Sequence, residues 1–154
     1  MKDLNRHLVI EQIDKKLRNY AGIKDIEVPV KGWVHALRTA INMSQKQLGA
    51  RLGITKQSVQ EIETREADSK ITLEKLKEVA DVLDLKFVYG FVPKNGSLQK
   101  MIESRAFDTA KKIVLKTSHT MMLEEQENSP ERIKKAIEDR ANKIAEELPK
   151  YLWD

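Results

Sequence analysis

The stretch from Thr55 to Glu61 concentrates side chains that can form hydrogen bonds with a nucleic acid. A glutamine amide can bond an adenine edge through two hydrogen bonds, and a lysine can reach the acceptor atoms of guanine. Hydroxyl groups and the free N–H groups at the start of a helix suit phosphate oxygens. On these grounds the predicted DNA contacts are Gln45, Lys46, Thr55, Lys56, Gln57, Ser58, Gln60, Glu61 and Arg65.

The segment around these side chains carries positive charge. Between Glu27 and Glu61 the chain has five basic residues and no acidic one, although 24 of its 154 residues are acidic. The net charge is +4, and all of this excess lies before residue 97. A segment without acids avoids repelling a polyanion, so the pattern favours duplex DNA as a partner. Glu61 either accepts a hydrogen bond from a cytosine amino group or lies at the margin of the contact.

Two short helices joined by a glycine turn would position these side chains. Ser44, with Gln47 three residues later, forms a capping-box pattern that predicts the start of a helix. Gly53 ends this helix, because glycine accepts a left-handed conformation without steric cost. Thr55 predicts the start of a second helix, which is expected to run to Glu63.

Small and apolar residues mark the inner face of this helix pair. Gly49 lies where the two helices would cross, and Val59 and Ile62 form an apolar stripe on the second helix. With these residues inside, the N-terminal end of the second helix points its polar side chains toward solvent. The spacing indicates a helix-turn-helix, whose second helix enters the major groove of DNA.

Further helices are predicted on both sides of this pair. Apolar residues recur every three or four positions in 3–20, 33–42 and 98–126, and capping residues predict helix starts at Thr72 and Ser129. The C-terminal helices are expected to pack on each other, on the N-terminal helix or on a second subunit. The predicted parts are an N-terminal helix and connector at 1–30, a helix-turn-helix domain at 31–85, a short β segment at 86–96 and a helical region at 97–154.

The β segment is predicted from KFVYGFV, residues 86–92, in which aromatic residues occupy every second position. Its three aromatic side chains would face one way, and Gly90 would permit a bulge or a close approach of another group. A single strand cannot stand alone, since an unpaired apolar edge invites pairing. Its partner is either the segment IEVPV, residues 26–30, or a strand from another subunit.

Little in the sequence indicates catalysis, a cofactor or a membrane. The chain has no cysteine, which excludes disulfides and thiolate metal sites and fits a reducing cytoplasm. Its three histidines are far apart, and no phosphate-binding glycine loop or nucleophile motif is present, so we expect no metal, cofactor or enzymatic activity. No apolar run approaches the ~20 residues of a membrane helix, and residues 1–12 lack the core of a signal peptide. A cytoplasmic protein without a membrane partner is expected.

Residues 43–63, MSQKQLGARLGITKQSVQEIE, resemble the Cro/repressor (XRE-like) class of helix-turn-helix domains. The resemblance implies a mainly α, lambda-repressor-like bundle, with extra terminal helices here, that binds operator DNA as a dimer. It also implies that Arg38 in the preceding helix pairs with Glu63. Gly49 departs from the usual alanine, which would loosen its helix by up to ~1 kcal/mol. Arg65 departs from a common glycine after the second helix.

Segments outside this motif are similar to the family called mobile mystery protein A. They are ITLEKLKEVADVLDLKFVYGFVP, GSLQKMIESRA, SHTMMLEEQE and YLWD. Members are typically encoded beside a Fic-domain protein, so the resemblance implies a regulator or antitoxin-like partner of a Fic toxin. Fic-inhibitory helices carry Ser or Thr, then Glu four residues later, then Gly or Asn. Thr120 and Glu124 have this spacing, but Glu125 replaces the Gly or Asn, so inhibition through such a helix is not supported.

The predicted function is sequence-specific binding of double-stranded DNA in transcriptional regulation. The helix from Lys56 to Glu63 would enter a major groove, with Gln45, Thr55 and Ser58 fixing phosphates. A homodimer would place two such helices roughly 34 Å apart on a near-palindrome. The alternative is a protein-interaction module that holds a Fic-domain partner, with DNA binding secondary. An uncovered groove on the C-terminal helices would favour that alternative.

Overall fold

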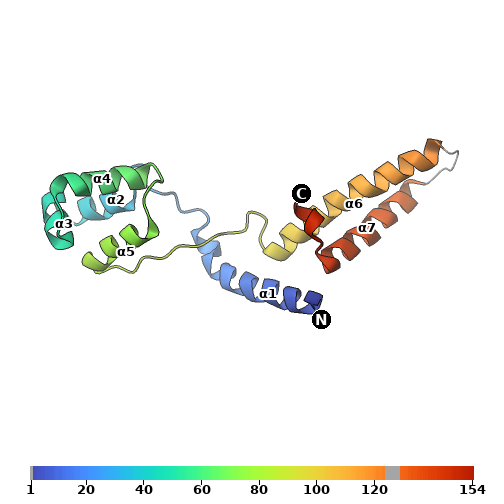
Figure 1. Cartoon of the computed structure of the whole chain (residues 1–154), viewed down its shortest axis with the longest axis horizontal. Coiled ribbons are helices and arrows are strands. Elements are labelled where there is room, and N and C mark those ends of the chain that lie inside the picture. The colour runs from blue at the N-terminus through green and yellow to red at the C-terminus, as the bar shows by residue number, and fades with distance from the viewer. Residues whose placement is uncertain (1, 124–128) are drawn as a thin grey trace. The chain divides into compact units, whose positions relative to one another are not determined.

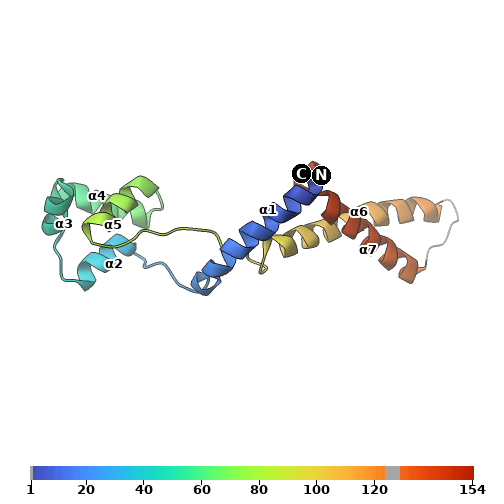
Figure 2. The ribbon, with the colours of Figure 1, turned by 90° about the horizontal axis from the view of Figure 1, so that it is seen from below.

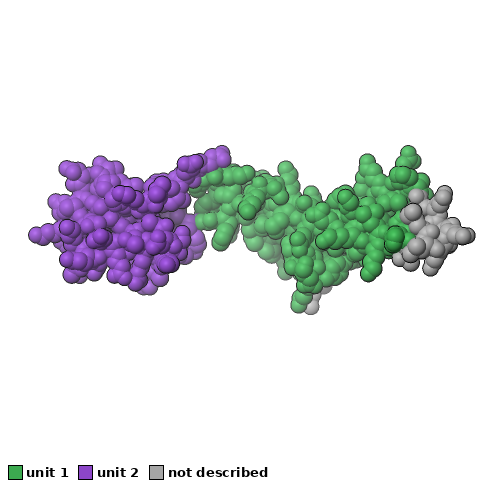
Figure 3. All heavy atoms as spheres, turned by 90° about the horizontal axis from the view of Figure 1, so that it is seen from above, with its two compact units in different colours: residues 1–24, 90–154 green, residues 25–89 purple. Residues whose placement is uncertain are grey.

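The computed structural model describes residues 2–123 and 129–154, which fold into two compact units. One unit comprises residues 25–89, and the other joins residues 1–24 to residues 90–154 (Figure 3). Helices make up the regular structure of these described ranges (Figure 1). They are α1 (Lys2–Leu17), η1 (Arg18–Ile23), α2 (Trp33–Ala40), α3 (Gln45–Leu52), α4 (Lys56–Ala67), α5 (Leu73–Val82), α6 (Leu98–Leu123), α7 (Pro130–Glu147) and η2 (Lys150–Trp153).

The unit of residues 25–89 is a bundle of the four short helices α2 to α5. Hydroxyl side chains begin three of them, because Ser44, Thr55 and Thr72 each accept a hydrogen bond from a backbone N–H of the first turn. The predicted starts of these helices are therefore confirmed. Apolar side chains from all four helices meet in one core, whose buried members are Val34, Leu48, Val59, Ile62 and Val79.

The other unit is built on a helical hairpin. Helices α6 and α7 run side by side in opposite directions (Figures 1 and 2). Ala106 and Ala110 are fully buried between them, and their small side chains allow the two helices to approach closely. Helix η2 folds back onto the hairpin, where Arg105 donates a hydrogen bond to the carbonyl of buried Leu152 at 2.9 Å. Ser129 begins α7 as predicted.

Helix α1 docks on this hairpin largely through polar contacts. The Asp14 carboxylate accepts the backbone N–H groups of Leu98 at 2.7 Å and of Gln99 at 3.1 Å, and so caps α6 from outside that helix. The His7 ring bonds the carbonyl of Glu146 at 2.9 Å. The apolar stripe predicted for α1 is only partly used for packing. Ile10 and Leu17 are partly buried, whereas Leu4, Leu8 and Ile13 are exposed.

The β segment predicted at residues 86–96 is not seen as a strand. The structure has no strand among the residues it describes, and residues 86–92 share no backbone hydrogen bond with residues 26–30. Alternation of side chains supplies one extended segment, but a strand exists only through hydrogen bonds to a second one. The alternation itself is present, since the rings of Phe87 and Tyr89 stack with their centroids 5.9 Å apart.

Two other expectations concern the region around the end of α6. The helix predicted at 98–126 corresponds to α6 as far as Leu123, and its last residues lie outside the described part of the chain. The Fic-type spacing of Thr120, Glu124 and Glu125 likewise lies outside the described side chains. Within the ranges that the structure covers, none of the helices combines the length and apolar character needed to cross a bilayer.

Candidate nucleic-acid interface

Helix α3 is fixed at both ends by the residues that predicted it. The Ser44 hydroxyl accepts the N–H of Gln47 at 3.1 Å, and the Gln47 amide oxygen accepts the N–H of Ser44 at 2.8 Å. This reciprocal capping box satisfies two backbone donors at the start of the helix. Gly53 ends the helix in the left-handed conformation, with φ at 70°. Both local signals for α3 are confirmed.

Gly49 has a steric function in the turn between α3 and α4. A Cβ atom at this position would lie 2.7 Å from the carbonyl oxygen of Ile54, which is closer than real Cβ contacts. The Ile54 N–H also donates to the carbonyl of Gly49 at 2.9 Å, so the turn packs directly against α3. The departure from the usual alanine is therefore matched by the tight approach of the turn.

Helix α4 begins as expected and ends later than predicted. The Thr55 hydroxyl accepts the N–H of Ser58 at 3.1 Å. The helix then runs to Ala67, so the predicted end at Glu63 is too early, and Arg65 lies within the helix instead of after it. No glycine or proline stands between Glu63 and Ala67 to stop it. Arg65 is exposed and forms an ion pair with Glu61 at 2.6 Å.

The outer surface of α3 and α4 carries most of the predicted DNA contacts on exposed positions. Leu48, Val59 and Ile62 are buried on the opposite side, as the spacing predicts. Ser58 and Gln45 are half-buried, at the edges of the outer surface. The exposed members of the set are Lys46, Thr55, Lys56, Gln57, Gln60, Glu61 and Arg65.

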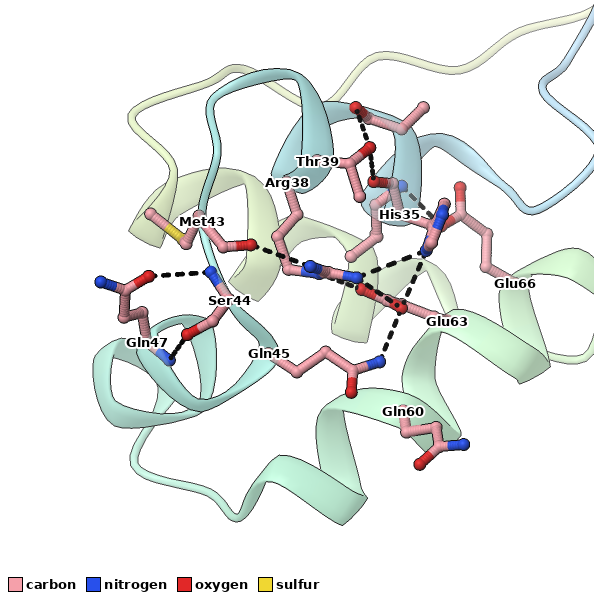
Figure 4. A network of polar contacts seen from close by, with 12 residues as sticks. His35, Arg38, Thr39, Met43, Ser44, Gln45, Gln47, Gln60, Glu63 and Glu66 are labelled. Carbon is pink, nitrogen blue, oxygen red and sulfur yellow. Dashed lines mark hydrogen bonds and ion pairs between the residues drawn. The ribbon is translucent and has the colours of Figure 1, made fainter.

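A buried polar network joins α2, α3 and α4 beneath this surface (Figure 4). The carboxylate of Glu63 accepts hydrogen bonds from the guanidinium of Arg38 through Nε and through Nη2, the latter at 3.2 Å. It also accepts the Nε2 amide of Gln45 at 3.0 Å and Nδ1 of His35 at 3.2 Å. Arg38 donates in addition to the carbonyl of Met43 at 2.8 Å. The pairing of Arg38 with Glu63 that the resemblance implies is thus present.

The network keeps Glu63 ionised despite its burial. Burial alone raises the pKa of this carboxyl, but hydrogen bonds from Arg38, Gln45 and His35 and the charge of Arg38 lower it by more, so the pKa lies below its ordinary value. An ionised Glu63 can accept all of these donors at once. The three helices are therefore held by charge-assisted hydrogen bonds in addition to the apolar core.

The network changes what Gln45 offers to a ligand. Its side-chain amide nitrogen donates one of its two hydrogens to Glu63, which leaves one N–H donor and the amide oxygen for other partners (Figure 4). The backbone N–H of Gln45, in the first turn of α3, is the group that suits a phosphate. The side chain of Gln45 thus links α3 to Glu63, and its contact with a phosphate stays a prediction.

The fold also decides which basic residues of the acid-free segment, residues 28–60, are exposed. Arg38 is buried and neutralised by Glu63, so it adds little to the field outside the molecule. Arg51 is exposed and donates to the carbonyl of Val82 at 3.4 Å. Lys31, Lys46 and Lys56 are exposed. Two of these three lysines, Lys46 and Lys56, stand at the N-terminal ends of α3 and α4, where the helix dipoles also favour an anion.

Sequence reasoning missed two residues that hold α2 in place. Glu66 accepts the N–H groups of Trp33 at 2.7 Å and Val34 at 2.9 Å, and so caps α2, whose own N-cap residue Gly32 has no side chain. His35 bonds Glu63. A signal for Glu66 existed, because it follows Glu63 by three residues and lies on the same face of α4.

The described residues give no support to a metal site. They contain no group of three or more histidine, cysteine, aspartate or glutamate side chains that could hold a metal ion. His35 is committed to the network around Glu63, and His7 to the docking of α1.

Comparisons with known proteins agree with this geometry. Residues 34–89 match the family described as Helix-turn-helix. The match runs from the second residue of α2 through α5, and therefore includes the network, the turn and the outer surface of α4. Neither the curated proteins nor the solved structures gave a match to the chain. The match supports a Cro/repressor-like helix-turn-helix domain at residues 34–89, a domain type of DNA-binding regulators.

Proposed function

We propose that the chain binds double-stranded DNA sequence-specifically, as a homodimeric transcriptional regulator. The observation that carries the proposal is the outer surface of α4, whose polar side chains are exposed while the helix is fixed by the Arg38–Glu63 pair beneath it. A surface that reads bases must present its side chains from a rigid element, since small displacements break hydrogen-bond geometry. In this proposal the protein acts in the cytoplasm and is associated with the nucleoid when it is bound to DNA.

In this proposal α4 enters the major groove with its N-terminal half. Lys56, Gln57 and Gln60 reach base edges, where lysine suits guanine and glutamine suits adenine. The ion pair with Arg65 compensates the negative charge of Glu61. This pairing favours the second alternative for Glu61, a place at the margin of the DNA contact. Arg65 then contacts the phosphate backbone beside it.

Phosphate contacts come from the ends of the two helices. Lys46 and the backbone N–H of Gln45 serve one phosphate at the start of α3, and Thr55 and Ser58 flank another at the start of α4. The two hydroxyl oxygens lie 2.9 Å apart, so one of them donates to the other while the second keeps its hydrogen for a phosphate. Two such domains on a near-palindrome would stand roughly 34 Å apart, one turn of DNA.

Two substitutions separate base reading from phosphate contact. Gln57→Ala should cost ~1–3 kcal/mol on the preferred operator and relax the preference at one base position. Lys46→Ala should weaken binding to all duplexes alike and reduce the slope of log affinity against log salt by about one. Lys77→Ala, an exposed lysine of α5, is the control and should change neither property. Affinities of the full chain are measured by fluorescence anisotropy over a range of salt concentrations.

The proposal fails if Gln57→Ala and Lys46→Ala behave like Lys77→Ala. If Gln57→Ala weakened all sequences equally, α4 would bind the DNA backbone and would not read bases. The same full chain must keep its helical circular dichroism in all three variants, so that a loss of affinity reports on contacts and not on folding.

A groove on the helical hairpin favours a second candidate function, the binding of a Fic-domain partner. Apolar side chains of Ile113, Val114 and Ile133 line it, with the exposed Ala136 between Arg132 and Arg140 on α7. We propose on this ground, and on the resemblance to the mobile mystery protein A family, that the chain regulates an operon containing a Fic-type toxin and contacts that protein. DNA binding would then serve autoregulation.

Filling the groove tests this second function. Ala136→Trp should abolish binding to a Fic-domain protein, as measured by calorimetry, while DNA affinity stays unchanged. Asn142→Trp, at an exposed position on the same helix, is the matched control. Equal binding by both variants, or no binding by the unmodified chain, would remove the groove from consideration.

A further inference from the structure

The backbone of residues 86–92 is unpaired along its whole length. Within the described part of the chain, none of its seven N–H groups or carbonyls takes part in a hydrogen bond. The unpaired stretch has defined ends. On one side the Leu85 N–H donates to the carbonyl of Ala80 at 2.8 Å, and on the other side Pro93 has no N–H to donate. The free stretch is therefore centred on Tyr89.

The side chains of this stretch are those of a paired strand. Val88, Tyr89 and Phe91 are exposed, Phe91 to 80%, although valine and aromatic residues favour strands in which they are covered. An extended apolar segment with a free backbone edge is a template for another strand. The expectation that residues 26–30 provide this strand is not met, and Pro29 would remove one donor from such a pairing.

The two sides of the stretch differ in what covers them. A Cβ atom on Gly90 would lie 2.8 Å from Cε1 of Tyr20, so the Tyr20 ring lies against the segment on that side. Alternation places Val88 and Val92 on the same side as Gly90, and the aromatic residues on the other. The rings of Phe87 and Tyr89 are already stacked there. Tyr20 therefore covers the stretch only at Gly90, and Val88, Tyr89, Phe91 and the backbone edge remain open.

We propose that residues 86–92 pair with the same residues of a second copy of this chain, as an antiparallel two-stranded ribbon with Tyr89 on the two-fold axis. In this register residues 86–92 of one copy lie opposite residues 92–86 of the other. The two unpaired stretches therefore overlap over their full length, because both are centred on Tyr89. Phe87 then stands opposite Phe91 of the second copy, and both copies contribute their aromatic side chains to one side of the ribbon. A shift of register by one residue would separate these aromatic side chains onto opposite sides.

The charge of the stretch fits the same register. Lys86 is the one charged residue among residues 86–92. Lys86 comes opposite Val92, so no like charges face each other along the ribbon. The contact is isologous, as closed two-fold dimers require. Each strand uses one of its two hydrogen-bonding edges in this pairing, and its other edge stays at the outside of the ribbon.

This inference rests on the proposed homodimer and specifies its contact surface, and its test uses no DNA. A failure of base reading by α4 would leave the test unaffected, and a failure of the test would leave the contacts of a single domain with DNA unaffected.

Cysteine cross-linking gives the direct test, because the full chain has no cysteine of its own. Residues opposite each other in an antiparallel pair have Cβ atoms about 4.5–5.5 Å apart. Tyr89→Cys should therefore form a covalent dimer with a short thiol cross-linker. Phe87→Cys should not cross-link with itself, but a mixture of Phe87→Cys and Phe91→Cys should give mixed dimers. Val30→Cys, on a residue that is 95% exposed, is the control for random collision.

Sedimentation of the full chain gives the second test. Phe91→Lys should raise the dimer dissociation constant at least tenfold while helical circular dichroism stays unchanged, and Val30→Lys should leave the dimer as it is. The proposal is overturned by a monomeric chain, or by a dimer that resists Phe91→Lys and gives no covalent product at Tyr89→Cys. Protection of the amides of 86–92 from hydrogen exchange in a monomer would also overturn it, in favour of pairing with residues 26–30.

Discussion

The two units of this molecule hold their helices together in different ways. In the helix-turn-helix unit, side chains from α2 and α3, among them Arg38 and Gln45, bond the one buried carboxylate of Glu63. In the helical unit, α1 is held by separate polar contacts at the surface or half-buried, His7 with Glu146 and Asp14 with Leu98 and Gln99.

The bonds between α2, α3 and α4 thus depend on one residue, Glu63, whereas the contacts that hold α1 are separate from one another. Removal of a partner from a buried network leaves a charge without compensation, whereas removal of one dispersed contact leaves the remaining contacts in place. The chain provides a reporter for each unit, because Trp33 lies in the first and Trp153 in the second. Replacement of either tryptophan by phenylalanine leaves the fluorescence of the other to follow its own unit.

The largest effect is expected at the centre of the network. Arg38→Ala should lower the unfolding free energy of the helix-turn-helix unit by about 3–5 kcal/mol, because Glu63 would remain buried without its ion partner. Urea denaturation followed by Trp33 fluorescence, in a Trp153→Phe background, measures the change. Arg65→Ala breaks the exposed pair with Glu61 and should cost at most about 0.5 kcal/mol.

If Arg38→Ala does not fold, Arg38→Lys keeps the charge but loses the two-pronged geometry, and an intermediate loss is expected. Equal losses for Arg38→Ala and Arg65→Ala would contradict the central role given to the buried carboxylate.

A smaller effect is expected in the turn. Gly49→Ala should destabilise the helix-turn-helix unit by about 1–2 kcal/mol, since the clash with the Ile54 carbonyl outweighs the gain of ~1 kcal/mol in helix propensity. Gly22→Ala is the matched control in the helical unit, where an added Cβ meets nothing within 4 Å, and should cost nothing. A stabilised Gly49→Ala protein would show that the turn can move away from α3.

A comparable or smaller effect is expected where α1 docks. Asp14→Ala removes the cap that α1 provides to α6 and should lower the stability of the helical unit by ~1 kcal/mol, as measured by Trp153 fluorescence in a Trp33→Phe background. Glu11→Ala, an exposed carboxylate of the same helix, should have no measurable effect. The affinity of the protein for DNA should be the same in both variants. A loss of DNA affinity in Asp14→Ala alone would mean that the units are coupled.

The last prediction concerns the stability of the helix-turn-helix unit at acidic pH, and it has the smallest effect at neutral pH. The pKa of Glu63 is lower in the folded unit than in the unfolded chain, so its contribution to stability is present above the unfolded value of about 4.3 and is lost as the pH falls through the lower, folded value. Urea midpoints of the helix-turn-helix unit should therefore fall more steeply below about pH 4.3 in the unmodified chain than in Glu63→Gln. Parallel curves for the two proteins would mean that Glu63 does not titrate with folding.

The helix-turn-helix could be predicted because its signals are local. Ser44, Gly53 and Thr55 act on backbone groups within three residues of themselves, so their effect does not depend on the rest of the fold. The late end of α4 was missed because Arg65 occupies a position where the resemblance implied a turn, and only a residue that stops a helix would have marked the end.

The sequence could predict which side chains of the candidate site face outward, but not which hydrogen bonds join its helices. The outward positions of Lys56 and Gln57 follow from the period of the helix once Val59 and Ile62 are buried. The bond between Gln45 and Glu63 joins two helices at a distance that no sequence pattern encodes. The same holds for the Asp14 cap. The predicted strand failed because its partner is absent from the chain's own fold.

The central claim is that α4 reads a specific DNA sequence. Selection of binding sites from random duplexes by the unmodified full chain, in parallel with Gln57→Ala, tests it most directly. We expect a near-palindrome with half-sites about 10 base pairs apart, as a two-fold dimer on one DNA turn requires, and a loss of preference at one position per half-site in the variant. The absence of any enriched sequence, or the same enriched sequence at full strength with Gln57→Ala, would contradict the account.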